Sequence, residues 1–280
     1  MHIFTAPDGT ELAYHVKGRG EPLICLPGGP MRASAYLEDL GGLDAHRRLI
    51  LLDLRGTGKS AVPEDPATYR CDRQTGDVEA LRVHLGLERV DLLAHSAGSN
   101  LALLYALAHP ARVRRMALLA PALRALGQVS SIDRWREHTE HRAGEPWYPA
   151  ARAALERIAA GADTDEVWDA VGPFFFGRWT DAARRSEAGA AAQVNEAAAE
   201  VYYEPGTFDV PAIRTAAAAL PVPVLLLSGA YDWNPRPSDA QDAAALLPGG
   251  RHVLQPGAVH MPWVDDGPFV ARQVESFLAE

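Results

Sequence analysis

The chain has 280 residues, of which 48% are hydrophobic and 22% are charged, and its formal net charge is −9 at pH 7. This size and composition favour one large α/β domain that carries an inserted lobe. The negative charge argues against nucleic acid or an anionic membrane as a partner, because either would require a basic surface.

Export and membrane insertion are also disfavoured. The N-terminal segment has Asp8 and Glu11 where a signal peptide would have an apolar run, and no stretch reaches the ~18 apolar residues of a spanning helix. Only Cys25 and Cys71 occur, and Cys25 lies in the apolar run PLICL, so a disulfide framework is not expected. We expect a cytoplasmic protein with no membrane partner.

Short apolar runs alternate with longer helical patterns along the chain. Residues 2–18 predict a hairpin that turns at Asp8-Gly9. Nearly continuous apolar runs, typical of parallel strands buried on both faces, follow at residues 22–26, 48–54, 90–94, 115–120 and 222–229, with a shorter one at 251–255. Helical patterns lie at residues 72–86, 97–109, 237–247 and 266–279. This alternation predicts the α/β class, with a mostly parallel central sheet flanked by helices.

The alternation stops between residues 124 and 208. This region is rich in Ala, Arg and Glu, has helical spacing throughout and contains no buried strand run. A helical block inserted between two strands of one sheet predicts a cap, or lid, over one end of that sheet. We therefore expect residues 1–123 and 209–280 to form the core and residues 124–208 to form the helical cap.

The segment DLRGTGKS, Asp53 to Ser60, resembles a phosphate-binding loop at first sight. The pattern G-x-x-x-x-G-K-[ST] would need glycine at position 53, which is Asp, and a helix directly after the loop. The following AVPEDPATY contains Pro63 and Pro66, which would break such a helix. A tight turn is the better interpretation.

The apolar run at 90–94 leads into HSAGSNLALLYALAHP. Residues 94–98 match the nucleophile elbow G-x-S-x-G with Ala94 in place of the first glycine. The elbow holds its serine in a strained turn, and small residues are needed two positions to either side because strand and helix approach closely. Ala94 and Gly98 meet this requirement, so we predict Ser96 as a nucleophile.

An acid and a histidine follow at the ends of two later strands. The run 222–229 leads to Asp232, and the run 251–255 leads to His260. Because the carboxyl ends of parallel strands share one edge of the sheet, we predict Ser96, Asp232 and His260 as a catalytic triad. No metal or organic cofactor is expected, since the pair His138 and His141 lacks a third ligand nearby.

Gly28-Gly29, just past the run 22–26, can direct backbone N–H groups at a developing oxyanion. We predict the N–H groups of Gly29 and Ala97 as the oxyanion hole, because Pro30 has no N–H to offer.

With these motifs the sequence resembles the α/β-hydrolase family over nearly its whole length, and within it the proline iminopeptidase-type branch. The matching segments are PGGP (27–30), DLRGTGKS (53–60), AHSAGSNLAL (94–103), SGAYD (228–232) and GAVH (257–260). The resemblance implies that DLRGTGKS is a structural turn that binds no nucleotide. The sequence departs from the branch at Pro27, Met31, Leu54 and Ala97, which leave the fold and the triad intact and the peptidase specificity open.

We therefore predict a serine hydrolase that acts through an acyl-enzyme on a small-molecule or short-peptide ester or amide. An N-terminal (proline-type) aminopeptidase, a carboxylesterase, thioesterase or lactonase, and a C–C bond hydrolase all stay open. The alternative from another class is a non-catalytic binding protein on this scaffold. Dehalogenases and epoxide hydrolases are excluded, because those similar families have Asp where Ser96 stands.

Aromatic residues gather in the lid and beside Asp232 and His260. We expect Phe175, Trp179, Trp233 and Trp263 to line an apolar substrate pocket, although packing between lid and core explains part of them equally well. The resemblance implies that aminopeptidases of the family hold the substrate ammonium with lid carboxylates. Glu196 is our candidate for that role, and the solvated face of an Ala-rich helix is the alternative.

Overall fold

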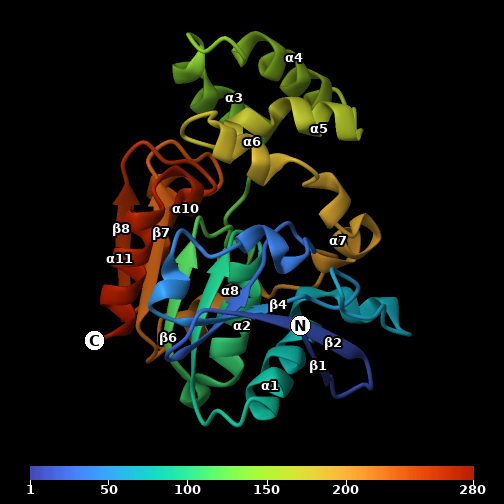
Figure 1. The fold of residues 1–280 in the computed structure, drawn as a ribbon, viewed down its shortest axis with the longest axis vertical. Helices are drawn as coiled ribbons and strands as arrows, with labels where there is room; N and C mark the ends of the chain where they lie inside the picture. Colours follow the sequence, from blue (N-terminus) through green and yellow to red (C-terminus); the bar gives the residue numbers. More distant parts are fainter.

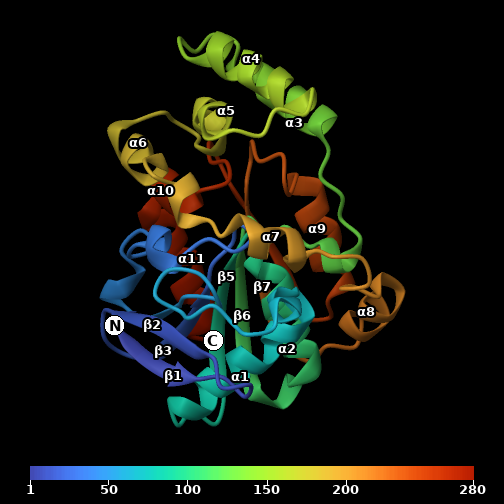
Figure 2. The ribbon, with the colours of Figure 1, turned by 90° about the vertical axis from the view of Figure 1, so that its right-hand side faces the viewer.

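The computed structural model describes residues 1–280 and contains one eight-stranded sheet (Figures 1 and 2). Its strands are β1 (His2–Thr5), β2 (Glu11–Lys17), β3 (Pro22–Leu26), β4 (Arg48–Leu52), β5 (Val90–His95), β6 (Val113–Leu119), β7 (Val224–Gly229) and β8 (Gly250–Gln255). Their spatial order is β1-β2-β4-β3-β5-β6-β7-β8. The pairs β1–β2 and β2–β4 are antiparallel and the others are parallel, so the predicted fold class is confirmed.

Six helices belong to the core, and four of them lie where the helical patterns predict them. They are α1 (Thr75–His84), α2 (Gly98–Ala108), α8 (Val210–Ala217), α9 (Pro237–Leu246), α10 (Pro262–Asp265) and α11 (Gly267–Leu278). Of these, α8 and the single-turn α10 have no counterpart in the sequence prediction. Both begin with proline in their first turn, a position that tolerates the missing N–H group.

Alternate residues of the central strands pack on opposite faces of the sheet. In β3, Ile24 and Leu26 join one cluster with residues of α1 and α2, while Leu23 and Cys25 join another with residues of α11. The residues of both clusters are buried. Because both faces of the sheet are covered, the strand sequences are nearly continuous in apolar residues. Burial on both faces fixes the register, because a one-residue slip would exchange the two sets.

Between β6 and α8 the chain adds no strand to the sheet. It forms α3 (Ile132–Thr139), α4 (Tyr148–Ala159), α5 (Asp165–Val171), α6 (Asp181–Glu187) and α7 (Glu196–Tyr202). Figure 1 shows α3 to α6 above one end of the sheet, with α7 lower and beside it. Residues of α3, α4 and α5 share a small apolar cluster of their own. None of the helices has both the length and the apolar character that a membrane crossing requires.

The segment Asp53 to Ser60 is a turn organised around an inward carboxylate. Asp53 Oδ1 accepts hydrogen bonds from the N–H and hydroxyl of Ser34 at 2.9 and 2.7 Å, and Oδ2 accepts one from Lys59 N–H at 2.9 Å. Arg55 pairs with Asp77 of α1 and with Asp8 in the β1–β2 turn, at 2.5 and 2.7 Å. The turn thus joins the N-terminal hairpin, α1 and the loop after β3.

Replacing Arg55 with Ala should destabilise the fold by roughly 3–5 kcal/mol, because the carboxylate of buried Asp77 would lose its partner. Urea unfolding followed by circular dichroism measures this change. Replacing both residues, as in R55M/D77L, should cost less than R55A alone. The exposed pair of Arg251 and Glu280 supplies the control, since R251A should change stability far less. Equal losses in R55A and R251A would contradict this account of the turn.

Candidate active site

Ser96 occupies the sharp turn between β5 and α2. Its φ angle is 49°, a left-handed conformation that is strained for a residue with a side chain. The Ser96 N–H donates to Leu119 O in β6 at 3.0 Å, which holds the strained backbone in place. At Gly98 any side chain would collide with the carbonyl oxygens of Leu26 and Pro27. The local sequence is therefore dictated by how closely α2 approaches the end of β3.

The structure brings Ser96, His260 and Asp232 together from the ends of β5, β8 and β7. His260 Nε2 lies 2.9 Å from Ser96 Oγ, and His260 Nδ1 lies 3.0 Å from Asp232 Oδ2. A carboxylate can only accept, so Nδ1 carries the proton and Nε2 of the neutral ring is free to accept from the serine hydroxyl. Asp232 is completely buried and its other oxygen accepts from Asn234 N–H at 3.0 Å. The three side chains have the geometry of a nucleophile, a base and an orienting acid.

Two backbone N–H groups beside Ser96 have no partner within the chain. These are Gly29 N–H, after β3, and Ala97 N–H, at the start of α2. The neighbouring Gly28 N–H is already committed, since it donates to the Tyr36 hydroxyl at 2.7 Å. Gly28 itself lies against His95 and Ser96 so closely that a side chain there would meet the Ser96 Cβ atom. The sequence analysis predicts these two N–H groups as the oxyanion hole, and that role stays a prediction.

Tyr36 and His95 form a hydrogen-bonded chain that the sequence did not suggest. His95 Nε2 lies 2.8 Å from His260 O, which can only accept, so Nε2 carries the proton. His95 Nδ1 must then accept from the Tyr36 hydroxyl at 2.8 Å, and that hydroxyl oxygen accepts from Gly28 N–H. Burial, with a smaller contribution from His260, holds the pKa of His95 well below its usual range, so the ring stays neutral.

The lid is bonded directly to the loop that carries His260. Phe175 O accepts from the N–H groups of His260 and Met261 at 3.0 and 3.2 Å. Asp265 accepts from Gly177 N–H in the lid at 2.7 Å and from Val259 N–H at 3.0 Å. Burial raises the pKa of the Asp265 carboxyl to about 6. Lid and catalytic loop are therefore held as one unit at this point.

The aromatic candidates separate into two groups. The Phe175 ring lies 5.9 Å from the His260 ring and 6.1 Å from the Trp233 ring, and Trp233 stacks on Trp135 of α3 at 4.3 Å. The Trp263 ring packs edge-on to His95 at 4.8 Å. Trp179 instead contacts Phe176 and the guanidinium of Arg184, with no ring contact to the triad.

The Glu196 side chain makes no hydrogen bond or ion pair, and its role stays a prediction. It is exposed at the start of α7, beside a surface hollow that Gly56, Thr57 and Gly58 also line. A different lid carboxylate, Glu187 at the end of α6, is affected electrostatically by groups of the site. Burial raises the pKa of Glu187 to about 7, against the influence of Arg32 and His260, which lower it.

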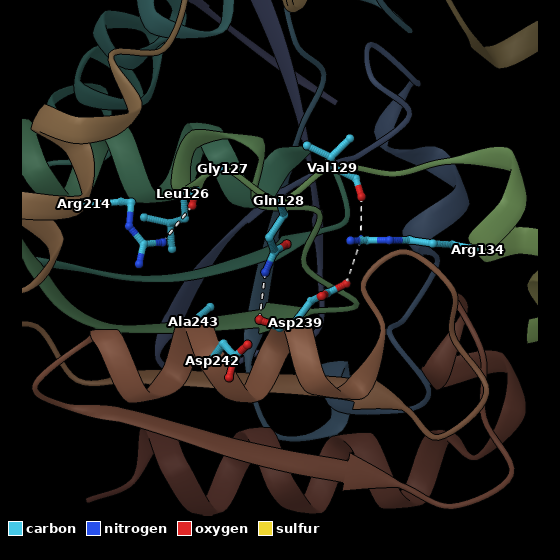
Figure 3. A pocket seen from close by; sticks show the side chains of 9 residues that line it. All are labelled: Leu126, Gly127, Gln128, Val129, Arg134, Arg214, Asp239, Asp242 and Ala243. Atoms are coloured by element: carbon cyan, nitrogen blue, oxygen red, sulfur yellow. Dashed lines mark hydrogen bonds and ion pairs between the residues drawn. The ribbon is translucent and has the colours of Figure 1, made fainter.

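A separate hollow of about 350 Å³ lies where the chain leaves the core for the lid. Figure 3 shows Gln128 and Arg134 pointing toward Asp239 of α9. Gln128 donates to Asp239 O at 2.8 Å, and Arg134 lies 3.3 Å from the Asp239 carboxylate. These contacts fasten the first stem of the lid to the core, and none of the predicted site residues lines this hollow.

Three residues near the site escaped the sequence reasoning: Arg32, Tyr36 and Glu187. Arg32 and Tyr36 follow the Gly-Gly turn within one short loop. Their short distance in sequence from Gly28 could have marked them as candidates for the site. Nothing local marks Glu187, because its side chain is covered by residues distant in sequence, such as Gly172. His95 stood inside the elbow motif, but its role depends on Tyr36.

Comparisons with known proteins identify the family of this chain. The model of the alpha/beta hydrolase fold matches residues 21–266. A proline iminopeptidase of Levilactobacillus brevis is 28% identical over 272 residues, which cover 92% of this chain and 88% of that protein. The proline iminopeptidase of Mycobacterium smegmatis superposes with a TM-score of 0.73 at 25% identity, covering 99% of this chain and 98% of that one. The esterase RhEst1 of Rhodococcus sp. ECU1013 superposes with a TM-score of 0.77 at 25% identity, covering 100% and 98%. The chain therefore belongs to the α/β-hydrolase family and is a hydrolase.

Proposed function

We propose that this hydrolase is a serine hydrolase that forms an acyl-enzyme on Ser96. The observation that carries the proposal is the alignment of Ser96, His260 and Asp232 at 2.9 and 3.0 Å, with Ser96 in a left-handed backbone conformation at the end of β5. Its substrate would be a small ester or amide, the bond classes for which this arrangement suffices.

Each step uses a group in the site. Ser96 Oγ attacks the substrate carbonyl while His260 Nε2 accepts its proton, and Asp232 stabilises the resulting imidazolium. The carbonyl oxygen, now negative, would be held by the N–H groups of Gly29 and Ala97. His260 then gives the proton to the leaving group. In the second half, His260 takes a proton from water while the hydroxide attacks the acyl carbon, and His260 then returns the proton to Ser96 Oγ as the bond to Ser96 breaks and the acid leaves.

A fluorophosphonate probe should label Ser96, and S96A should lower kcat by about 10³-fold or more on any ester that the protein hydrolyses. Mass spectrometry of the labelled peptide identifies the site. Ser99 provides a matched control, because it is a buried serine in the next turn whose hydroxyl has no hydrogen-bond partner. Labelling and turnover that persist in S96A but disappear in S99A would refute the proposal.

The chain Gly28–Tyr36–His95–His260 gives Tyr36 and His95 a positioning role in this mechanism. These consecutive hydrogen bonds join two parts of the site. One end holds the loop that contains Gly29, and the other end holds the backbone carbonyl of His260. All donors and acceptors of this hydrogen-bonded chain are satisfied only when His95 is neutral. A buried network of this kind restricts the orientation of the groups that it joins.

Tyr36→Phe should lower kcat about five- to thirtyfold with a small change in KM, because losing one buried hydrogen bond costs about 1–2 kcal/mol and here misplaces the oxyanion loop. Steady-state kinetics on one ester, together with thermal unfolding, measure the two effects separately. Tyr105→Phe is the control: it removes a buried hydroxyl that donates to Glu79 at 2.8 Å, remote from Ser96, and should lower Tm without lowering kcat. Equal kinetic effects of both variants would show that Tyr36 acts only through stability.

An N-terminal aminopeptidase is the second candidate, supported by the names of two relatives, the proline iminopeptidases described above. A substrate ammonium would need a carboxylate near Ser96, and Glu187 is better placed for it than the exposed Glu196. Hydrolysis of prolyl or other aminoacyl arylamides, lost in E187Q and retained in E196Q, would support this candidate. Turnover of simple esters without any turnover of such arylamides would exclude the aminopeptidase and support an esterase.

A further inference from the structure

Five arginines are buried in this protein, and one of them has no carboxylate partner. Arg47, Arg55, Arg82 and Arg142 each lie within 4.0 Å of an acidic side chain. Arg32, only 6% exposed, is in no ion pair. A buried charge without a counter-charge is costly, so an unpaired one marks a place where a ligand can supply the missing charge.

The guanidinium of Arg32 is held rigidly beside the catalytic groups. Its Cζ atom lies 4.3 Å from the centre of the Tyr36 ring, whose hydroxyl contacts Gly28 and His95. Nε donates to Gln193 Oε1 at 2.9 Å, and Nη2 lies 3.4 Å from Ser186 O. Nη1 has no hydrogen-bond partner, although it is not sealed from solvent. The Nη1 edge of this fixed, planar guanidinium is therefore free to donate hydrogen bonds to a ligand.

Glu187 shows that Arg32 and the catalytic histidine share one environment. The charges that act on its carboxyl are those of Arg32, Asp169 and His260. With a pKa of about 7, Glu187 is mostly protonated at pH 6 and mostly ionised at pH 8. In its neutral form it can donate a hydrogen bond and does not cancel the positive charge of Arg32.

We propose that Arg32 binds a carboxylate of the substrate, so that the preferred substrates are small esters or amides bearing a free carboxylate in addition to the bond that is cleaved. This inference rests on the proposed serine hydrolase function and names its substrate class. Arg32 suits the role because a planar guanidinium matches the two oxygens of a carboxylate. A cationic substrate would meet repulsion from the same group. The ionised form of Glu187 would repel the anion, so binding should be tighter at pH 6 than at pH 8.

Three esters of similar size test the class: monoethyl glutarate, which is anionic, ethyl glutaramate, its neutral amide, and ethyl 5-aminopentanoate, which is cationic. At pH 6, kcat/KM for the anionic ester should exceed that for the neutral ester at least tenfold, as expected for a charge-assisted contact. Arg32→Gln should reduce this ratio about ten- to a hundredfold, and Arg32→Lys should retain part of it. A ratio near one in the wild type, a ratio unchanged in R32Q, or a preference for the cationic ester would overturn the proposal.

Arg142→Gln is the matched control for R32Q. Arg142 is also buried and stacked on an aromatic ring, with its Cζ atom 4.8 Å from the Trp147 ring centre, but it is paired with Glu145. The R142Q variant should leave the ratio of kcat/KM between the anionic and the neutral ester unchanged. A loss of the ratio in R142Q equal to that in R32Q would mean that general damage to the lid, and no specific contact, controls selectivity.

The pH dependence of the ratio isolates Glu187. Any effect of pH on the chemical steps that the two esters share cancels in the ratio. Between pH 6 and pH 8 the ratio should fall by up to about tenfold, which is the change in the protonated fraction of a group whose pKa is about 7. E187Q should make the ratio constant over this range. A falling ratio that persists in E187Q would show that another group controls the effect and would overturn this part of the proposal.

Binding to the S96A variant separates this inference from the proposed mechanism. Isothermal titration of S96A with monoethyl glutarate should show binding that weakens at least tenfold in S96A/R32Q. If the wild type hydrolyses none of the three esters and no probe labels Ser96, while this binding still depends on Arg32, the mechanism fails and the carboxylate site stands. Binding that is absent, or independent of Arg32, overturns the carboxylate site even where Ser96 is the nucleophile.

Discussion

The left-handed backbone of Ser96 is the constraint on which the rest of the site depends. Such a conformation costs a residue with a side chain about 1–2 kcal/mol, and here it is held by the hydrogen bond to Leu119 and by the packing of α2 against the loop after β3. The strain lifts Oγ out of the strand end and leaves Ala97 N–H without an internal partner. The proposed nucleophile and one proposed oxyanion donor would therefore come from a single local distortion.

Buried charges organise the layer around that distortion. Asp53 and Arg55 fix the turn that supports the oxyanion loop, and each is satisfied within the protein. Asp232 is satisfied by His260 and Asn234. Arg32 differs because its nearest protein partners are an amide oxygen and a carbonyl. The contrast shows that the fold can pair its interior arginines when their role is structural, which makes the exception informative.

The sequence was sufficient for the features that local chemistry determines. The elbow around Ser96 and the strand ends before Asp232 and His260 could be found because each is a short pattern with a required neighbour, and the fold class followed from the alternation of strands and helices. Contacts between distant segments could not be found this way. Glu196 was chosen from its surroundings in sequence, and Glu187 was not considered, because contacts with residues distant in sequence, such as Gly172, cover its side chain. Tyr36 was missed because a hydroxyl has no spacing signature.

The two attachments of the lid divide it into parts with different freedom to vary. Phe175 and Gly177 are bonded to the loop of His260, and residues 193–195 pair with residues 31–33 beside Gly28. The helices α4 and α5 lie before these attachments and pack largely on α3, which is itself anchored to the core through Arg134 and Asp239 and through the stacking of Trp135 on Trp233. During divergence, or in an engineered chimera, this outer portion can be lengthened, shortened or exchanged for that of a relative without displacing the base. Changes at the two attachments would instead shift the loops that carry His260 and Gly29.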